Sequence, residues 1–349
     1  MTCLGHGWRC GVEWGLFSLA RNGEEDMVKQ REKLWDFDSV ELGQVGNETV
    51  VEITDENIAK YAEVSLNPDP FYRTAGADLV ASPTMVMTYA PLLRDEIASA
   101  NGFVAVERSK TARRQTPFAK CEGRWFLPVK PGDTITGRRR VLEKYERRGS
   151  KFVTFRVEAI NQRGEKAAEY DYTCIFEYAQ GQRSVPPRAD APATTVPETP
   201  QPASFKLVDF EKASVGDSLN ELAITESQEI MNRKNDFRLA GQPSDSNIHT
   251  DEEFAKQNIF GSTTNSGPAT MSYVAQMLER NFPIGCFYNG GSLLMRAITP
   301  FRGGDTVTFQ GEITAKNEEG GRKTIEARVK GINQREELVC LSDAVLVFQ

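Results

Sequence analysis

The feature that most constrains how this chain can fold is an internal repeat. Three short segments return in the same order: 37–43 (FDSVELG) as 210–216 (FEKASVG), 131–134 (PGDT) as 303–306 (GGDT), and 160–163 (INQR) as 332–335 (INQR). In each pair, the second segment starts almost the same number of residues after the first. Three ordered matches at almost one offset indicate duplication of a whole domain.

A proline-rich segment separates the two copies. Residues 181–204 hold six of the 17 prolines in the 349-residue chain and almost no large apolar side chains. Such a segment cannot bury a core and is typical of an extended tether. We therefore expect a first domain at 36–180, a linker at 181–204 and a second domain at 205–349.

Residues 1–35 are predicted to be an N-terminal extension without fixed structure. Within it, 1–26 shows neither helical nor strand periodicity, and untethered termini are usually poorly ordered. The segment is either an extension of the chain or the product of an upstream start codon, with initiation at Met27. No apolar stretch is followed by a small-residue cleavage site, so we do not expect a signal peptide.

Each copy has the same expected order of elements: a short strand, a polar helix and loop, one long apolar helix, and several strands. The long helices are predicted to begin at Ser82-Pro83, with a kink at Pro91, and at Gly267-Pro268, because apolar residues recur there at i, i+3/i+4 and i+7. Period-2 segments predict strands at 151–160, 306–313 and 323–332, with a tight turn at 317–321. One helix followed by long strands is typical of the α+β class.

Composition excludes several functional classes. The net charge of −7 argues against nucleic-acid binding, and no stretch approaches the ~20 apolar residues of a membrane span. With two histidines in the chain, a multi-histidine metal site is not expected. The six cysteines form no C-x-x-C pair, which favours reduced thiols in the cytoplasm.

The chemistry is concentrated around His249, the one histidine outside the segment 1–26. On the residues alone, a histidine with nearby acids is more often a surface residue or a helix cap than a catalytic group. The surrounding motif, however, resembles the signature Asp-x-Asn-Pro-(Leu/Ile)-His of MaoC-like (R)-specific enoyl-CoA hydratases. The residues that carry the resemblance are Asp245, Asn247, Ile248, His249, Asp251, Phe254 and Ala255, followed by a loop that opens an apolar helix at Asn265-Ser266-Gly267-Pro268.

With the tandem repeat, the resemblance covers about 36–179 and 205–349. It implies a double hotdog fold, in which each half wraps an antiparallel sheet around one long helix. It also implies that the halves pair as a pseudo-dimer, so that the protein is either a monomeric pseudo-dimer or a homodimer.

The resemblance further implies a catalytic pair, Asp245 and His249, that grips one water molecule. Because the family's proline is missing, Asp245 lies one position closer to His249 than the signature requires. Either the loop is one residue shorter, or Ser244 occupies the position of the acid; we favour Asp245, which keeps its spacing to Asn247. Asn247 would orient the loop.

The helix entry supplies the other site residues. Gly267 is expected to donate its backbone N–H to the thioester oxyanion, because glycine allows close approach and the helix N-terminus favours negative charge. Ser266 and Asn265 are expected either to contact water or thioester, or to cap the helix.

The first half carries a degenerate copy of the signature, Asn67-Pro68-Asp69-Pro70-Phe71-Tyr72. Asn67 stands in the position of the acid and Tyr72 in that of the histidine. An amide cannot accept a proton as a carboxylate does, and a tyrosine is a poor base near pH 7. We therefore expect one working site, with Tyr72 only shaping the acyl tunnel.

The function implied is reversible hydration of a 2-enoyl thioester to an (R)-3-hydroxyacyl thioester, without a metal or other cofactor. The substrate would be carried by coenzyme A or an acyl carrier protein. Between Ala105 and Lys151, 14 Lys/Arg face five Asp/Glu; this excess either attracts such a carrier or is a solvated sheet face. Two alternatives remain, a non-catalytic acyl-thioester-binding protein and a hotdog thioesterase, which commonly uses an acid on the long helix.

Overall fold

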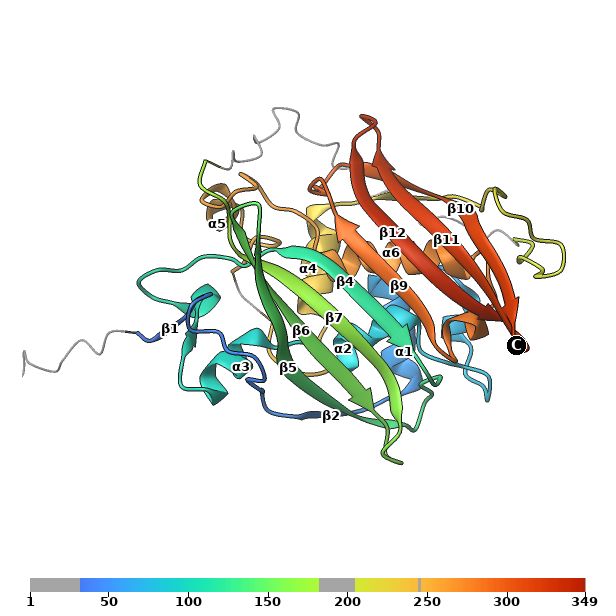
Figure 1. The fold of residues 1–349 in the computed structure, drawn as a ribbon, viewed down its shortest axis with the longest axis horizontal. Helices are drawn as coiled ribbons and strands as arrows, with labels where there is room; N and C mark the ends of the chain where they lie inside the picture. The colour runs from blue at the N-terminus through green and yellow to red at the C-terminus, as the bar shows by residue number, and fades with distance from the viewer. Residues whose placement is uncertain (1–31, 182–204, 244–245, 349) are drawn as a thin grey trace, which may run out of the picture.

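The computed structural model describes residues 32–181, 205–243 and 246–348 (Figure 1). The first half contains β1 (Leu34–Trp35), β2 (Thr49–Glu52), α1 (Asp55–Val64), η1 (Pro70–Arg73), η2 (Pro83–Met85), α2 (Val86–Tyr89), α3 (Arg94–Ala100), β3 (Val104–Ala105), η3 (Val106–Arg108), β4 (Phe118–Trp125), β5 (Thr134–Arg147), β6 (Ser150–Ile160) and β7 (Lys166–Glu177). The second half contains β8 (Leu222–Thr225), α4 (Gln228–Asp236), α5 (Glu252–Lys256), α6 (Gly267–Glu279), η4 (Ile284–Phe287), β9 (Gly291–Ala297), β10 (Thr306–Glu319), β11 (Arg322–Asn333) and β12 (Leu338–Phe348).

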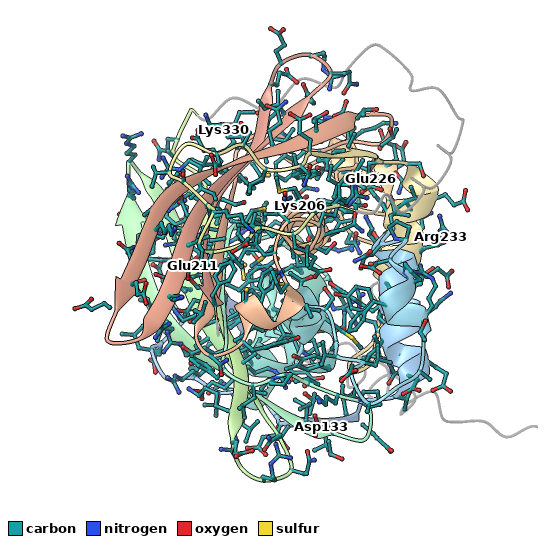
Figure 2. The ribbon with its side chains drawn as sticks, turned by 90° about the vertical axis from the view of Figure 1, so that its right-hand side faces the viewer. Asp133, Lys206, Glu211, Glu226, Arg233 and Lys330 are labelled. Carbon is teal, nitrogen blue, oxygen red and sulfur yellow. The ribbon has the colours of Figure 1, made fainter. Side chains whose placement is uncertain are left out.

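Ten strands form one continuous antiparallel sheet in the order β2-β5-β6-β7-β4-β9-β12-β11-β10-β8. Each half contributes five strands in the same relative order, so the sheet is symmetric about the junction of β4 with β9. The α+β prediction is confirmed. Side chains fill the space between the curved sheet and the helices on its concave side (Figure 2).

The backbone irregularities repeat as the sequence does. A register shift lies between Val141 and Glu143 in β5, and another lies between Ile313 and Ala315 in β10. The distance along the chain between the two shifts equals the offset of the sequence repeat. Because a bulge bends its strand and increases the local twist, both halves curve around their helices at equivalent points.

The halves pair through β4 and β9, with Cys121 opposite Met295 and Trp125 opposite Gly291. One apolar core contains buried residues of both halves. Trp125 shows how tightly they fit: its ring meets that of Phe287 edge-on at 5.6 Å, and its Nε1 donates to the carbonyl of Pro83 at 2.7 Å. The two copies therefore share a sheet and a core, as a pseudo-dimer.

The long-helix prediction is correct for the second half and wrong for the first. α6 begins at Gly267, as expected, and buries most of its side chains. In the first half the helical residues end at Tyr89 and resume only at Arg94, and Leu93 has a positive φ of 44°. Pro91 disfavours helical backbone at the preceding residue and cannot donate an amide hydrogen bond, so it breaks the helix instead of kinking it.

Three strand predictions are confirmed, within β6, β10 and β11. The turn between the last two is shorter than expected, because β10 continues to Glu319. Gly320 and Gly321 make the turn alone, with φ of 58° and 81°. Two adjacent positive φ values suit glycine and allow a two-residue hairpin.

The predicted extension ends earlier than residue 35. Residues 1–31 and the linker residues 182–204 lie outside the described part of the chain. Leu34 and Trp35, however, pair in parallel with β3, and Trp35 is buried in a second apolar cluster beside Phe155 and Phe176. The expectation of disorder is wrong for these two residues, because an indole of this size gains stability from burial.

In the described part of the chain, no helix is long and apolar enough to cross a membrane. Cys121, Cys174, Cys286 and Cys340 are buried free thiols.

The shared core predicts that the two halves unfold together. Trp125→Ala removes a buried side chain at the junction and is expected to lower the free energy of unfolding by about 3–5 kcal/mol. Urea denaturation followed by circular dichroism should show one transition shifted as a whole. Val50→Ala, at a position that is 67% exposed, is the control and should change stability by less than about 0.5 kcal/mol. Two separate transitions, of which only one shifts, would contradict a common core.

Candidate functional site

A pocket of about 360 Å³ lies between the two halves. The second half contributes His249, Asn247 and the entry of α6, including Asn265 and Ser266. The first half contributes an apolar wall of Tyr61, Val64, Met87, Leu92, Leu93, Tyr170 and Tyr172, and beside it polar side chains that include Arg94, Asp95, Glu107 and Arg108. The pocket thus combines apolar surface with several polar groups, an arrangement typical of ligand sites.

His249 is held in one orientation. Its Nδ1 lies 2.7 Å from the carbonyl oxygen of Thr264, and its backbone N–H donates to Asn247 Oδ1 at 2.7 Å. A carbonyl oxygen only accepts, so Nδ1 carries the proton of the neutral imidazole. Nε2 is then the unprotonated nitrogen, and no described residue bonds to it. Within the described part of the chain, the ring has a free lone pair beside the pocket.

Burial lowers the pKa of His249 from 6.5 to about 4. The Thr264 carbonyl opposes this shift, while the positive charges of Arg238 and Arg94 add to it. At neutral pH the imidazole is consequently uncharged. A neutral imidazole with a free Nε2 can accept a proton, as a general base must.

The loop that carries His249 is supported by α4. Asn247 Nδ2 donates to Asn235 Oδ1 at 2.9 Å, and Gln228 Nε2 donates to the carbonyl of His249 at 2.8 Å. These contacts reach the loop from opposite ends of one helix. Asn247 also accepts from the amide of His249, so it links the loop to α4.

α4 itself is anchored by a buried ion pair. Lys234 Nζ lies 3.0 Å from Glu226 Oε2, and the hydroxyl of Tyr273 on α6 donates to the same oxygen at 2.9 Å. Figure 2 shows Glu226 beside the helices, next to α4. Burial raises the pKa of Glu226 and lowers that of Lys234, although each partner's charge opposes the shift of the other. Removing one partner would leave an unpaired buried charge, so the pair fixes α4 strongly.

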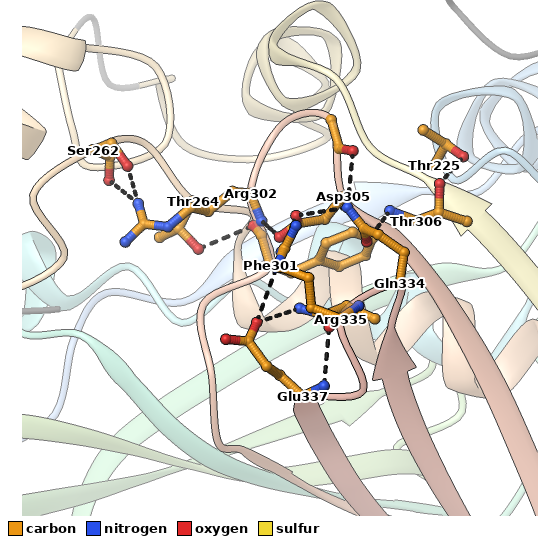
Figure 3. Close-up of polar contacts among 12 residues, drawn as sticks. Thr225, Ser262, Thr264, Phe301, Arg302, Asp305, Thr306, Gln334, Arg335 and Glu337 are labelled. Atoms are coloured by element: carbon orange, nitrogen blue, oxygen red, sulfur yellow. Dashed lines mark hydrogen bonds and ion pairs between the residues drawn. The ribbon is translucent and has the colours of Figure 1, made fainter. Parts of the chain in front are cut away.

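The loop before α6 is held from the opposite side by residues 301–305 (Figure 3). Arg302 donates to the carbonyls of Phe260 and Ser262 at 2.5 and 3.2 Å. The Asn265 amide donates to the carbonyl of Phe301 at 2.6 Å. Asp305 accepts from the Arg302 amide and from Arg335, which joins the loop to the end of β11.

Ser266 and Asn265 serve the helix and also line the pocket. Ser266 is the N-cap of α6 and accepts from the Ala269 amide at 3.3 Å. Asn265 Oδ1 accepts from the Ser266 amide at 3.0 Å. The capping alternative is therefore observed, and contact with a ligand remains open to both side chains.

Position 267 has no room for a side chain, because of a neighbouring ring that the sequence did not indicate. A Cβ at this position would lie 2.2 Å from Cγ of Phe118, so the ring of β4 occupies the place of a side chain. Gly267 is not among the pocket-lining residues, although Ser266 and Pro268 on either side of it are. Its backbone N–H has no hydrogen-bond partner among the described residues, as is usual in the first turn of a helix.

Asp245 and Ser244 lie outside the described residues, so the choice between them stays a prediction. Asn67 and Tyr72 are described, and they lie apart from the pocket. Both donate to Glu279 Oε2 on α6, at 3.1 and 2.8 Å. Tyr72 is not among the residues that line this pocket, and its hydroxyl is bound across the interface of the halves, so its role in shaping the tunnel stays a prediction.

Glu279 escaped the sequence analysis because a single acid at the end of an apolar helix carries no motif. Its partners belong to the other half of the chain. In the part of the chain that the structure describes, no three His, Cys, Asp or Glu side chains are grouped so that they could hold a metal ion.

The comparisons with known families assign both halves. Residues 235–334 match the MaoC-like domain, and residues 42–170 match the FAS1-like dehydratase domain region. Among curated proteins, none matches this chain closely enough to count as a relative.

Solved structures give the same assignment for the fold. A MaoC-like dehydratase has a TM-score of 0.63 and 16% identity, covering 88% of this chain and 99% of its own. A MaoC domain protein dehydratase from Chloroflexus aurantiacus has a TM-score of 0.59 and 18% identity, with coverage of 90% and 97%. A Mycobacterium tuberculosis protein described as a double hotdog has a TM-score of 0.54 and 16% identity, with coverage of 90% and 98%. The fold is thus the tandem double hotdog, and the predicted resemblance is confirmed.

The protonation state of His249 can be measured directly. Selective histidine labelling leaves at most two sets of imidazole signals in the NMR spectrum, since the chain has two histidines, and His249→Gln assigns the one of interest. We expect the His249 signal to titrate near pH 4 and not near 6.5.

Because the folded pKa lies below that of the unfolded chain, the contribution of His249 to stability is full above pH 6.5 and is lost as the pH falls toward 4. The unfolding free energy of the native chain, compared with His249→Gln, should decline over that interval. A His249 signal that titrates at 6.5 would contradict its desolvation.

The packing of Gly267 predicts that alanine is poorly tolerated there. Gly267→Ala forces the Phe118 ring away from α6 and should cost about 1–3 kcal/mol of stability. Gly76→Ala is the matched control, because a Cβ at that position meets nothing within 4 Å. Gly267→Ala should cost less stability in a chain that already carries Phe118→Ala than in the native chain. Equal melting temperatures for Gly267→Ala and Gly76→Ala would exclude this packing constraint.

Proposed function

We propose that this tandem MaoC-like protein reversibly hydrates a 2-enoyl thioester to an (R)-3-hydroxyacyl thioester. The observation that carries the proposal is the neutral His249, held by Thr264 with its Nε2 free of described partners, in a pocket that also has an apolar wall. The double-hotdog dehydratase relationship of both halves supports the reaction class.

In the proposed reaction, His249 Nε2 and Asp245 hold one water molecule. The water gives up a proton as its oxygen bonds to C3, and the electron pair of the C2–C3 double bond moves toward the thioester carbonyl. The acid–base pair then returns a proton to C2. The net change is addition of H and OH, and the reverse sequence is dehydration. Neither direction requires an oxidant, a metal or a cofactor.

The negative charge that develops on the thioester oxygen needs a donor. We assign this role to the backbone N–H of Gly267, which has no partner among the described residues and stands at the N-terminus of a 13-residue helix. Pro268 follows and has no N–H. A fixed donor at the positive end of a helix dipole is effective because it does not have to reorient during the reaction.

The apolar wall from the first half would receive the acyl chain. Leu92 and Leu93 lie in the interruption between α2 and α3, where their side chains are available to the pocket. The first half would then contribute to substrate binding while the second half performs the chemistry. Fixing the acyl chain on one side of the Asp245–His249 pair supports addition of water to one face of the double bond.

Arg238 is the most suitable group for an acidic carrier. It lines the pocket, and among the described residues its guanidinium donates only to backbone carbonyls at the end of α4, at 2.8 and 3.0 Å. By contrast, Arg94 and Arg108, which line the pocket from the first half, pair with Glu107 and Asp95. An arginine whose described partners are carbonyls suits the phosphates of coenzyme A or of a carrier protein.

The thioesterase alternative is less well supported. It calls for an acid on the long helix beside the thioester, yet the α6 residues that line the pocket are Pro268, Ala269 and Ser272. The acid of that helix, Glu279, is bound to the first half.

A panel of 2-enoyl-CoAs, followed by loss of the enoyl absorbance, tests the proposal. His249→Ala and Asp245→Asn should each lower kcat by about 10²-fold or more, and their combined effect should be non-additive since both act on one water. Tyr72→Phe should leave kcat within a few-fold. Ser244→Ala decides the register: a small effect supports Asp245 as the partner, whereas a loss equal to that of His249→Ala would assign Ser244.

Three other outcomes would overturn the proposal. Release of free coenzyme A, detected with a thiol reagent, would mean thioester hydrolysis. Binding of acyl-CoA without turnover at any chain length would mean a binding protein. Loss of activity in Tyr72→Phe but not in His249→Ala would place the chemistry in the other half.

A further inference from the structure

The degenerate signature of the first half surrounds a side chain of the second half. Glu279, the last residue of α6, accepts at Oε2 from Asn67 Nδ2 (3.1 Å) and from the Tyr72 hydroxyl (2.8 Å). At Oε1 it accepts from the Ser82 hydroxyl at 2.9 Å. The three donors are buried; Asn67 and Tyr72 lie in the degenerate signature segment, and Ser82 precedes η2. The carboxylate of Glu279 thus binds three polar side chains of the first half's counterpart of the site.

The donors are the counterparts of the candidate active-site residues. Asn67 occupies the position of Asp245, and Tyr72 that of His249. Ser82 precedes Pro83 as Gly267 precedes Pro268. One carboxylate oxygen therefore sits between Asn67 and Tyr72, where the proposed reaction places a water molecule between Asp245 and His249.

The pseudo-symmetry continues on the helices. The step along the chain from Pro268 to Glu279 equals the step from Pro83 to Arg94. Arg94 lines the pocket beside His249. The equivalent positions thus carry a cation that lines the candidate site, paired with Glu107 of its own half, and an anion bound to the signature segment of the first half.

From this geometry we propose that the first half's counterpart of the active site is closed to ligand by Glu279 and is a hydrogen-bond lock between the two halves. The chain then has one ligand site, and the C-terminal end of α6 is fixed to the first half. The proposal does not depend on which reaction the other site catalyses.

The residue types fit a lock better than a decayed site. Asparagine and tyrosine both have a polar hydrogen to donate, and a carboxylate only accepts. An aspartate in the place of Asn67 would present only lone pairs to Glu279 and repel it. The two departures from the family pattern are therefore complementary to the acid they face. Hydrogen bonds to a charged acceptor are also stronger than those between neutral groups.

The lock contains a group that titrates near neutrality. Burial raises the pKa of Glu279 to about 7, although the Tyr72, Ser82 and Asn67 donors lower it. The other ionisable groups around it are Asp69 before η1, Tyr61 on α1, Tyr288 after η4 and the adjacent Arg280. Asp69 adds to the increase, and the tyrosines stay neutral because burial raises their pKa values.

The sign of the pH effect follows from this increase. Between pH 4.5 and 7 the folded chain keeps a proton on Glu279 that the unfolded chain releases. Stability from this group is therefore full at low pH and declines as the pH rises toward 7, by up to about tenfold in the folding equilibrium constant per pH unit. Above pH 7 the dependence disappears.

The first experiment measures the unfolding equilibrium of the full chain and of Glu279→Gln from pH 5 to 8. Glutamine keeps the shape and can accept from Tyr72 and Asn67 while donating to Ser82, so the variant should fold. The ratio of the two folding constants should fall with pH up to 7, by between about threefold and tenfold per unit. Glu63→Gln is the control, because Glu63 is an exposed acid paired with Lys60, and its ratio should stay constant.

The second experiment is a double-mutant cycle of Glu279→Gln with Tyr72→Phe at pH 8, where the carboxylate is charged. Tyr72→Phe removes one donor and lowers the folding constant. The factor by which it does so should be about fivefold or more smaller in the Glu279→Gln variant than in the native chain. A ratio independent of pH in the first experiment, or additive effects in the second, would overturn the lock.

Discussion

The antiparallel pairing of β4 with β9 is the contact on which the rest of the structure depends. Each half alone would present one of these strands as a long edge of a five-stranded sheet, which is a template for unwanted association. Their pairing leaves β2 and β8 at the outer edges, and both have only four residues. The pocket lies between the halves, so it exists only when this junction has formed.

Duplication allows the two copies to diverge in ways that identical subunits cannot. α6 remains a continuous helix that carries the candidate oxyanion donor at one end and Glu279 at the other. The equivalent segment of the first half is interrupted at Pro91, which brings Leu92, Leu93 and Arg94 to the pocket wall. A change that would affect both sites of a homodimer is therefore confined here to the first half and leaves α6 intact.

The sequence was sufficient for those features that depend on local periodicity or on the repeat. These include the tandem organisation and the start of α6. It could not supply contacts whose partners are far apart in the chain. It did not indicate that Phe118, from the other half of the chain, occupies the place that a Cβ on Gly267 would take. Glu279 belongs to no sequence motif, and its importance is seen only from its three hydrogen-bond partners in the first half. The full break at Pro91 also depends on how the interrupted segment packs.

The two signature segments differ in the direction of their hydrogen bonds. At His249, the Thr264 carbonyl fixes the proton on Nδ1 and leaves a lone pair on Nε2, so the site offers an acceptor to a water molecule. At Tyr72 and Asn67 the donors point at a carboxylate that has no hydrogen to give when it is charged. A negative charge at the C-terminal end of α6 opposes the helix dipole, and these donors compensate for it. The first-half segment thus presents donors to a carboxylate, whereas the second-half segment presents a lone pair to the pocket, and the same helix joins both.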